Sequence, residues 1–323
     1  MPALLLTPAG LDELVACLGQ ATPDSRLVAG GTDLVRAMHK EHWEPDLLID
    51  LSGVGELAYV RLAGGELRIG ATTTFARLQH DSAVLEHAAC LAQAAAQVGS
   101  AQIRNVGTVG GNIANASACA DSVTALVGLE ASVRTLDAAG AEATYPLSDF
   151  FRGGGLTRLR HDEAIVEVVV PLPGASAGPA ACTPRVSAFA KVGSRRTVSI
   201  ARLSMALVAT PEAAAPSGDG AAASPSGPGA PRLRDVRVSL GAVGEHAFRD
   251  AGLEALLEGR AAGAETARLF AEACGEAVRR AIPGRYSLPY KQHAVLGCAY
   301  DAWNGLGLCA PAEPDWLPSP ASP

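Results

Sequence analysis

Short apolar runs separated by turn residues fill the first fifty positions of the chain. ALLL predicts a strand, and the spacing of apolar residues in GLDELVACLGQ predicts an amphipathic helix. SRLVAGG predicts a strand that ends in a glycine turn, DLVRAMHK predicts a short helix, and PDLLIDLSG predicts another strand. The chain therefore opens with strands and helices in turn.

Two hairpins and a long helix are expected next. ELAYVRLAGGELRIGATTT predicts a hairpin that turns at Gly64–Gly65, and EASVRTLDAAGAEATYPL predicts a second hairpin. Between them, an alanine-rich helix is predicted over residues 81–98, then a loop, then a helix over 120–129. EAIVEVVVPLP predicts a strand closed by prolines. Because hairpins mix with helices and no β-α-β-α alternation is established, the pattern favours an α+β fold.

The stretch PLPGASAGPAACTP, residues 171–184, indicates a domain boundary. After it, the pattern predicts strands at 185–192, 200–209 and 232–243, and helices near 250–259, 263–280 and 289–305. Residues 211–231 contain only Ala, Pro, Ser, Gly, Asp and Glu, which predicts a disordered hairpin tip. The tail, 309–323, is expected to be flexible, although Trp316 could dock.

Composition narrows the class of function. The 323 residues suffice for two domains, and the net charge of −7 argues against nucleic acid as the main partner. The chain has no run of about 18 apolar residues, so no membrane span is expected, and its first twenty residues do not resemble a signal peptide. We therefore expect a cytoplasmic protein. The seven cysteines and seven histidines are dispersed, which predicts neither disulfides nor a metal site.

Two glycine clusters carry the candidate chemistry. VAGGTDL contains Gly30 and Gly31, and RNVGTVGGNIANASACADS contains Gly107, Gly110 and Gly111. Glycine lets a ligand touch the main chain, and successive exposed amides form a nest that suits a pyrophosphate. Neither cluster has the G-x-G-x-x-G spacing of a Rossmann fingerprint. Two separate loops could instead hold one diphosphate; the alternative is that both clusters are ordinary turns.

The same two motifs, in this order, strongly resemble the FAD-binding (medium) subunit of the molybdenum hydroxylase family, of the xanthine dehydrogenase and carbon monoxide dehydrogenase type. The likeness continues through PLSDFF, DEAIVEVVVPLP and FAKVGSRRTVSIARLSMAL to LPYKQHAVLGCAYDAW. It implies a two-lobed FAD-binding domain of the vanillyl-alcohol-oxidase (PCMH) type over 1–175, with lobes at about 1–55 and 56–175. A smaller α+β domain like the carbon monoxide dehydrogenase flavoprotein C-terminal domain would cover 182–308.

The resemblance also implies which residues bind FAD. The glycine segments would hold the diphosphate, with hydrogen bonds from Asn112 and Ser117. Asp121 would bind a sugar or ribityl hydroxyl, and Ile103, Ile165 and Lys191 would lie near the flavin ring. The complete predicted set is Val28, Ala29, Gly30, Gly31, Thr32, Asp33, Leu34, Ile103, Thr108, Val109, Gly110, Gly111, Asn112, Ser117, Asp121, Ile165 and Lys191.

Each of the more distant candidates has a structural alternative. Asp121 could simply cap the following helix, and Ile165 could be plain core. Lys191 could raise the flavin potential by stabilising the anionic reduced form, or it could be a solvated strand residue. Arg195 and Arg196 could be a surface pair or an interface contact.

The implied function is that of a xanthine dehydrogenase-like electron-transfer subunit with no catalytic residue of its own. FAD in this chain would receive electrons from [2Fe–2S] clusters of a small ferredoxin-like subunit and pass them to NAD+ or another acceptor. A large subunit would hold molybdopterin, and the complex is expected to be a dimer of heterotrimers. Xanthine is the first expected substrate, with carbon monoxide and N-heterocycles open. The alternatives are a stand-alone flavin oxidase of the same fold superfamily and a flavin-free scaffold.

Overall fold

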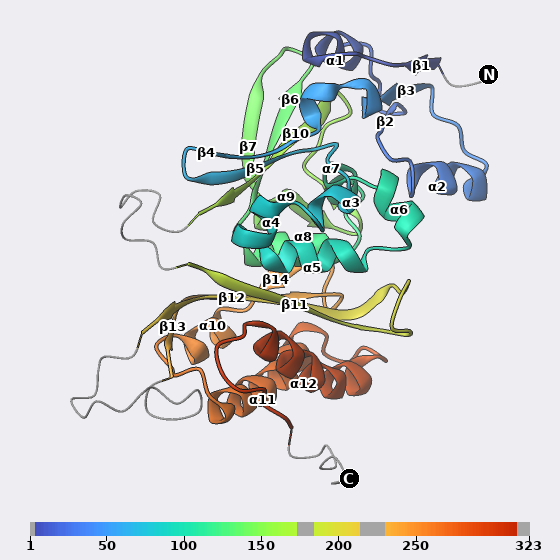
Figure 1. Ribbon diagram of the computed structural model, residues 1–323. Helices are drawn as coiled ribbons and strands as arrows, with labels where there is room; N and C mark the ends of the chain where they lie inside the picture. The colour runs from blue at the N-terminus through green and yellow to red at the C-terminus, as the bar shows by residue number, and fades with distance from the viewer. Residues whose placement is uncertain (1–3, 173–183, 214–229, 315–323) are drawn as a thin grey trace.

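The computed structural model describes residues 4–172, 184–213 and 230–314, and its first fifty residues form a small parallel sheet (Figure 1). The strands β1 (Leu4–Leu6), β3 (Leu47–Asp50) and β2 (Arg26–Val28) pair in this order, and α1 (Leu11–Leu18) and α2 (Leu34–Glu41) connect them. Parallel strands require such crossover connections. The strands and helices predicted for the first fifty residues are therefore confirmed in this lobe.

A second, antiparallel sheet follows. Its strands, in spatial order, are β4 (Val60–Ala63), β5 (Glu66–Gly70), β10 (Glu163–Pro171), β6 (Ser132–Asp137) and β7 (Glu142–Pro146). Both predicted hairpins are confirmed as β4–β5 and β6–β7, and the predicted strand before the prolines is its central member. A short ribbon, β8 (Phe151–Gly153) and β9 (Leu156–Thr157), precedes that central strand.

Short helices connect these strands. They are α3 (Phe75–Leu78), α4 (Ser82–His87), α5 (Ala89–Gln97), α6 (Ala101–Val106), α7 (Val109–Ala114), α8 (Asp121–Gly128) and α9 (Leu147–Phe150). The single helix predicted over 81–98 is in fact two, because Ala88 leaves the helical conformation with φ −145° and ψ 48°. The predicted loop before α8 contains α6 and α7, which begin at the side-chain caps Ser100 and Thr108.

The C-terminal half is a four-stranded antiparallel sheet covered by helices. Its elements are β11 (Val186–Gly193), β12 (Ala201–Glu212), β13 (Arg232–Gly241), β14 (Phe248–Arg249), α10 (Ala251–Leu257), α11 (Ala264–Ala281) and α12 (Leu288–Gly305). The strands and helices predicted for this half are confirmed; β14 was not predicted. In the described ranges, no helix combines the length and apolarity that a membrane crossing requires.

Two segments predicted to be loose are partly ordered. Pro211 and Glu212 extend β12 by pairing with β13, so the prediction of disorder is wrong for these two residues. Residues 214–229 of the predicted segment lie outside the described ranges. In the tail, Asn304 donates to the carbonyl of Ala312 (3.0 Å) and accepts from its N–H (2.8 Å), which fixes that part of 309–314. Trp316 and residues 173–183, where the domain boundary is predicted, also lie outside the described ranges.

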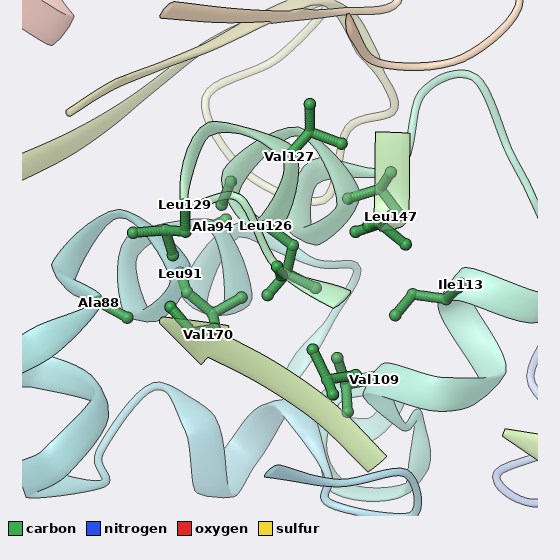
Figure 2. Packing of buried hydrophobic residues seen from close by; sticks show 14 of the residues in the cluster. Ala88, Leu91, Ala94, Val109, Ile113, Leu126, Val127, Leu129, Leu147 and Val170 are labelled. Carbon is green, nitrogen blue, oxygen red and sulfur yellow. The ribbon is translucent and has the colours of Figure 1, made fainter. Parts of the chain in front are cut away.

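One core joins the two halves. Helices α5 and α8 lie between the five-stranded sheet and the C-terminal sheet (Figure 1), and every residue of α8 is buried. Figure 2 shows Leu126 and Val127 of α8 in the same cluster as Leu91 of α5 and Val170 of β10. The approach to the C-terminal sheet is so close that a Cβ at Gly241 would lie 2.0 Å from Oγ1 of Thr124. Small residues thus permit the contact between the halves.

A buried carboxylate on the central strand connects neighbouring segments of the five-stranded sheet. Glu167 accepts hydrogen bonds from Tyr59 (2.5 Å) and Arg134 (2.7 Å), and its side chain is 2% exposed. Burial alone would raise the pKa of Glu167, but these hydrogen bonds and the charges of Arg134 and Arg68 outweigh burial and lower the pKa. The ionised form of Glu167 therefore stabilises the folded state.

We expect Glu167→Gln to lower the free energy of unfolding at neutral pH by about 2–3 kcal/mol, since a buried charged acceptor for two partly buried donors is lost. Because the folded pKa is depressed, this contribution exists above the unfolded pKa and disappears as pH falls through the folded pKa. Glu142 pairs with the same Arg134 but is half-exposed, so Glu142→Gln is the matched control. It should lower the free energy of unfolding by under about 1 kcal/mol. Denaturant titrations at neutral and acid pH measure both; equal costs would contradict the assignment.

Candidate functional site

A cavity of about 590 Å³ lies where the first parallel sheet meets α6, α7 and the segment before β10. Most of the predicted cofactor-binding residues line it: Val28, Ala29, Gly30, Gly31, Thr32, Asp33, Leu34, Ile103, Thr108, Gly110, Gly111, Asn112 and Ile165. Its size is in the range of pockets that enclose a small molecule or cofactor. The structure therefore assembles in one place residues that are up to 137 positions apart (from 28 to 165).

The two glycine clusters are in direct main-chain contact at this cavity. A Cβ on Gly30 would lie 2.0 Å from the carbonyl oxygen of Val106 and 3.0 Å from Cα of Gly107. Only glycine fits such an approach. Gly31 next to it has φ +65°, which turns the chain from β2 toward α2. The proximity that a shared site requires is thus present in the fold.

The two clusters differ in what their amides can offer a ligand. Among the described residues, the N–H groups of Gly30, Gly31, Thr32 and Asp33 have no acceptor. They lie at the start of α2, where unpaired amides and the helix dipole favour an anion. This turn has the four adjacent free donors that a phosphate-binding nest needs.

The second cluster is a capped helix start and not a bare loop. The N–H of Val109 donates to Thr73 O (3.0 Å), that of Gly110 to Ala71 O (2.9 Å), and that of Gly111 to Oγ1 of Thr108 (3.1 Å). The prediction that both clusters present uncovered amides is therefore wrong for the second. Gly110 is required by packing, since a Cβ there would lie 2.7 Å from that of Ala71.

Two isoleucines provide apolar surface to the cavity. Ile103 on α6 is 37% exposed, and Ile165 on β10 is 5% exposed. The pairing of β10 with β6 shifts register between Ile165 and Glu167, and such bulges reorient side chains. Ile165 both lines the cavity and belongs to the core, so the two interpretations proposed for it are compatible.

Four titratable residues of the cavity lining were not predicted: Arg26, Arg160, His161 and Glu163. Arg160 is paired with Asp137 (3.0 Å) and with further acidic neighbours, and Glu163 accepts from Thr135 (2.5 Å). No motif marks these residues in the sequence; Arg26 begins β2, Glu163 begins β10, and Arg160 and His161 lie just before β10. Because Arg160 and Glu163 already have protein partners, the free amides of the first turn remain the main donors.

Asp121 and Lys191 pair with each other and are not on the cavity wall. Nζ of Lys191 lies 2.5 Å from Oδ2 of Asp121, and both side chains are nearly buried. Burial raises the pKa of Asp121 to about 6, although Lys191 acts in the opposite direction. The helix-cap alternative for Asp121 is wrong, since its side chain makes no cap hydrogen bond, and so is the solvated alternative for Lys191.

Oδ1 of Asp121 has no hydrogen-bond partner among the described residues, which is costly for a buried carboxylate. The other two predicted residues outside the cavity wall have local roles: Ser117 accepts from the N–H of Cys119 (3.3 Å), and Val109 is fully buried. The described ranges contain no cluster of potential metal ligands.

An α+β lobe pair enclosing a cavity whose wall presents unpaired main-chain amides is typical of a cofactor-binding domain. Residues 3–173 match the family described as the FAD binding domain in molybdopterin dehydrogenase, and the chain belongs to that family. The predicted family, the FAD-binding domain of the PCMH type and the cofactor are thereby confirmed.

Curated relatives agree over this domain. The chain is 37% identical over 177 residues to the nicotinate dehydrogenase FAD-subunit of Eubacterium barkeri, covering 54% of this chain and 57% of that protein. It is 37% identical over 150 residues to the xanthine dehydrogenase FAD-binding subunit of Escherichia coli O157:H7, covering 46% and 51%. The matched part thus spans about half the length of these relatives.

A solved structure resembles nearly the whole chain. It is a carbon monoxide dehydrogenase from Hydrogenophaga pseudoflava that lacks the Mo-pyranopterin moiety of its cofactor. The match has a TM-score of 0.78 and 27% identity, and it covers 96% of this chain and 99% of that one. The match includes the C-terminal sheet and helices, so the predicted fold class, a FAD-binding domain followed by a smaller α+β domain, is confirmed.

We expect Gly30→Ala to weaken FAD binding about tenfold or more, because relieving the overlap with Val106 must move the turn and costs about 1–3 kcal/mol. Gly55→Ala is the control, since a Cβ there meets nothing within 4 Å. FAD titration of both full-length variants, with circular dichroism as a test of folding, makes the comparison. Wild-type affinity in a folded Gly30→Ala protein would remove this turn from the site.

Proposed function

We propose that this chain is the FAD-carrying electron-transfer subunit of a heteromeric molybdenum hydroxylase. The observation that carries the proposal is the set of four adjacent unpaired amides, Gly30 to Asp33, on the wall of a 590 Å³ cavity. The family assignment supplies the identity of the cofactor. FAD, when bound, supplies the electron chemistry; the chain binds and orients it.

Each part of the cavity has a distinct task in this proposal. The amides of Gly30 to Asp33 would hold the diphosphate, and the side chain of Asn112 would reach it from α7. Ile103 and Ile165 would offer apolar surface to the flavin ring. Asp121 lies outside the cavity wall, with Lys191 fixing its carboxylate, so it has no contact with FAD in this proposal.

The remaining components of the complex follow from the resemblance. A small subunit with [2Fe–2S] clusters would deliver electrons, and a large subunit would hold molybdopterin and the hydroxylation site, in a dimer of heterotrimers. NAD+ is the first proposed acceptor. Xanthine is the first proposed substrate, supported by the xanthine dehydrogenase relative; the nicotinate dehydrogenase relative supports an N-heterocycle instead. The cytoplasmic location stays a prediction.

Purified full-length protein should carry flavin, and acid precipitation should release it as FAD in an amount equimolar with the chain. Non-covalent binding is expected because, in the described ranges, the cavity lining contains no cysteine and His161 as its single histidine. Absorbance of the supernatant and of the pellet measures the release. Flavin that stays with the pellet would favour the stand-alone oxidase with a covalent cofactor. Protein that contains no flavin and takes up none when FAD is added would favour the scaffold.

A further inference from the structure

The acidic and basic residues of the chain are unevenly distributed. The chain has 33 Asp and Glu against 26 Lys and Arg, yet residues 99–120, 185–211 and 282–300 contain no Asp or Glu at all. Those segments contain eight basic residues: Arg104, Arg185, Lys191, Arg195, Arg196, Arg202, Arg285 and Lys291. An acidic protein thus contains three segments whose charge is entirely positive.

The fold brings these three segments together. Lys291, at the start of α12, donates to the carbonyl of Ala242, whose N–H donates to Ala118 O (2.9 Å). Ala242 directly follows Gly241, which pairs with Ser204 of β12, so Lys291 reaches the sheet beside the segment that contains Arg202. Burial lowers the pKa of Lys291, and the charges of Arg285 and Arg202 lower it further. The β11–β12 turn and the start of α12 therefore share one surface.

We call this surface the basic face; it consists of the turn 194–200, Arg202 and residues 285–291. Its apolar side chains are unusually open: Ile200 is 78% exposed, Val198 50%, Tyr290 50%, and Tyr286 fully exposed. Exposed tyrosine, arginine and aliphatic side chains in one place are the composition of a protein interface core.

The cations of the basic face lack acidic partners in the described part of the chain. Among the described residues, none of its four arginines has a carboxylate within ion-pair distance. Exposed arginines of α11 behave differently, since Arg268 pairs with Glu272 and Arg279 with Glu276. The positive charge of the basic face is therefore uncompensated within the described chain.

The turn itself is ordered by its own hydrogen bonds. Arg195 donates to the carbonyl of Val198 (2.7 Å), and the N–H of Ser194 donates to Oγ of Ser199 (2.9 Å). Val198 has φ +50°, a conformation that β-branched residues rarely adopt. A fixed turn that presents apolar and cationic side chains loses little entropy on binding.

The basic face adjoins the wall of the FAD cavity. Helix α7 lines the cavity through Asn112 and Ala114, and the chain then leads to Ala118 and Cys119. The carbonyl of Ala118 accepts from the N–H of Ala242, whose own carbonyl accepts from Lys291, so this segment lies beside the basic face. None of the residues of the basic face lines the cavity itself.

We infer that the basic face is the docking surface for an acidic protein that exchanges electrons with the flavin, namely the [2Fe–2S] subunit. Opposite charge would guide the partner and fix its orientation, and the tyrosines and Ile200 would be buried on contact. The face is built from a projecting turn and a helix start, a shape that suits a protein surface and not a nucleotide. This inference rests on the proposed function only for the identity of the partner.

The test is binding of the [2Fe–2S] subunit encoded with this chain, measured calorimetrically at several salt concentrations. We expect Arg196→Glu with Arg285→Glu to weaken binding about tenfold or more and to reduce its salt dependence. Arg268→Glu with Arg279→Glu, the same charge change on α11, should bind as the wild type does. A basic-face variant that binds as tightly as the wild type, or a control that loses as much affinity, would overturn the inference.

FAD content of every variant separates this inference from the proposed function. A basic-face variant that loses partner binding but retains FAD supports the basic face as the docking surface. Wild-type protein that takes up no FAD but still binds the subunit in a manner sensitive to Arg196 and Arg285 would contradict the flavin role and leave the docking surface supported. Wild-type protein that does not bind the subunit at all would contradict the docking surface.

Discussion

The contact between the main chain at Gly30 and the carbonyl of Val106 determines where the cavity lies. It joins the turn after β2 to the end of α6, two segments more than seventy residues apart, at a distance that excludes any Cβ. This contact fixes the position of the turn, so the turn keeps its shape although the amides of Gly30 to Asp33 have no acceptor in the described chain. Unpaired main-chain donors are costly unless water or a ligand satisfies them, so the arrangement favours binding.

The two glycine clusters resemble each other in sequence and differ in physical role. The first presents donors to the cavity. In the second cluster, the N–H groups already donate to Ala71, Thr73 and Thr108, and the glycines allow α7 to pack closely against its neighbours. An anion at this site would therefore be held mainly from one side, with Asn112 as the polar side chain from the other. This asymmetry follows from a helix cap that a count of glycines does not reveal.

The sequence predicts the hairpins, the C-terminal sheet and both glycine segments of the cavity lining, because these depend on local patterns and on a resemblance in motifs. Helices α6 and α7 were missed since six residues span fewer than two turns and show no clear period, although Ser100 and Thr108 are recognisable caps. The Asp121–Lys191 pair joins residues 70 positions apart, and Arg160 and His161 carry no motif, so only the folded chain brings these groups into place.

Helix α8 makes the two halves into one body. Its residues are all buried, Thr124 contacts Ser204 (3.0 Å) of the C-terminal sheet, and Asp121 at its start pairs with Lys191 of β11. A cation 2.5 Å from its carboxylate acts on more distant groups largely as a dipole, so Lys191 would influence a flavin less than an isolated lysine would. The ion pair also has a geometric consequence. Since β11 carries Lys191 and leads into the turn of the basic face, the ion pair connects that turn to the start of α8, the helix that follows α7 of the cavity wall.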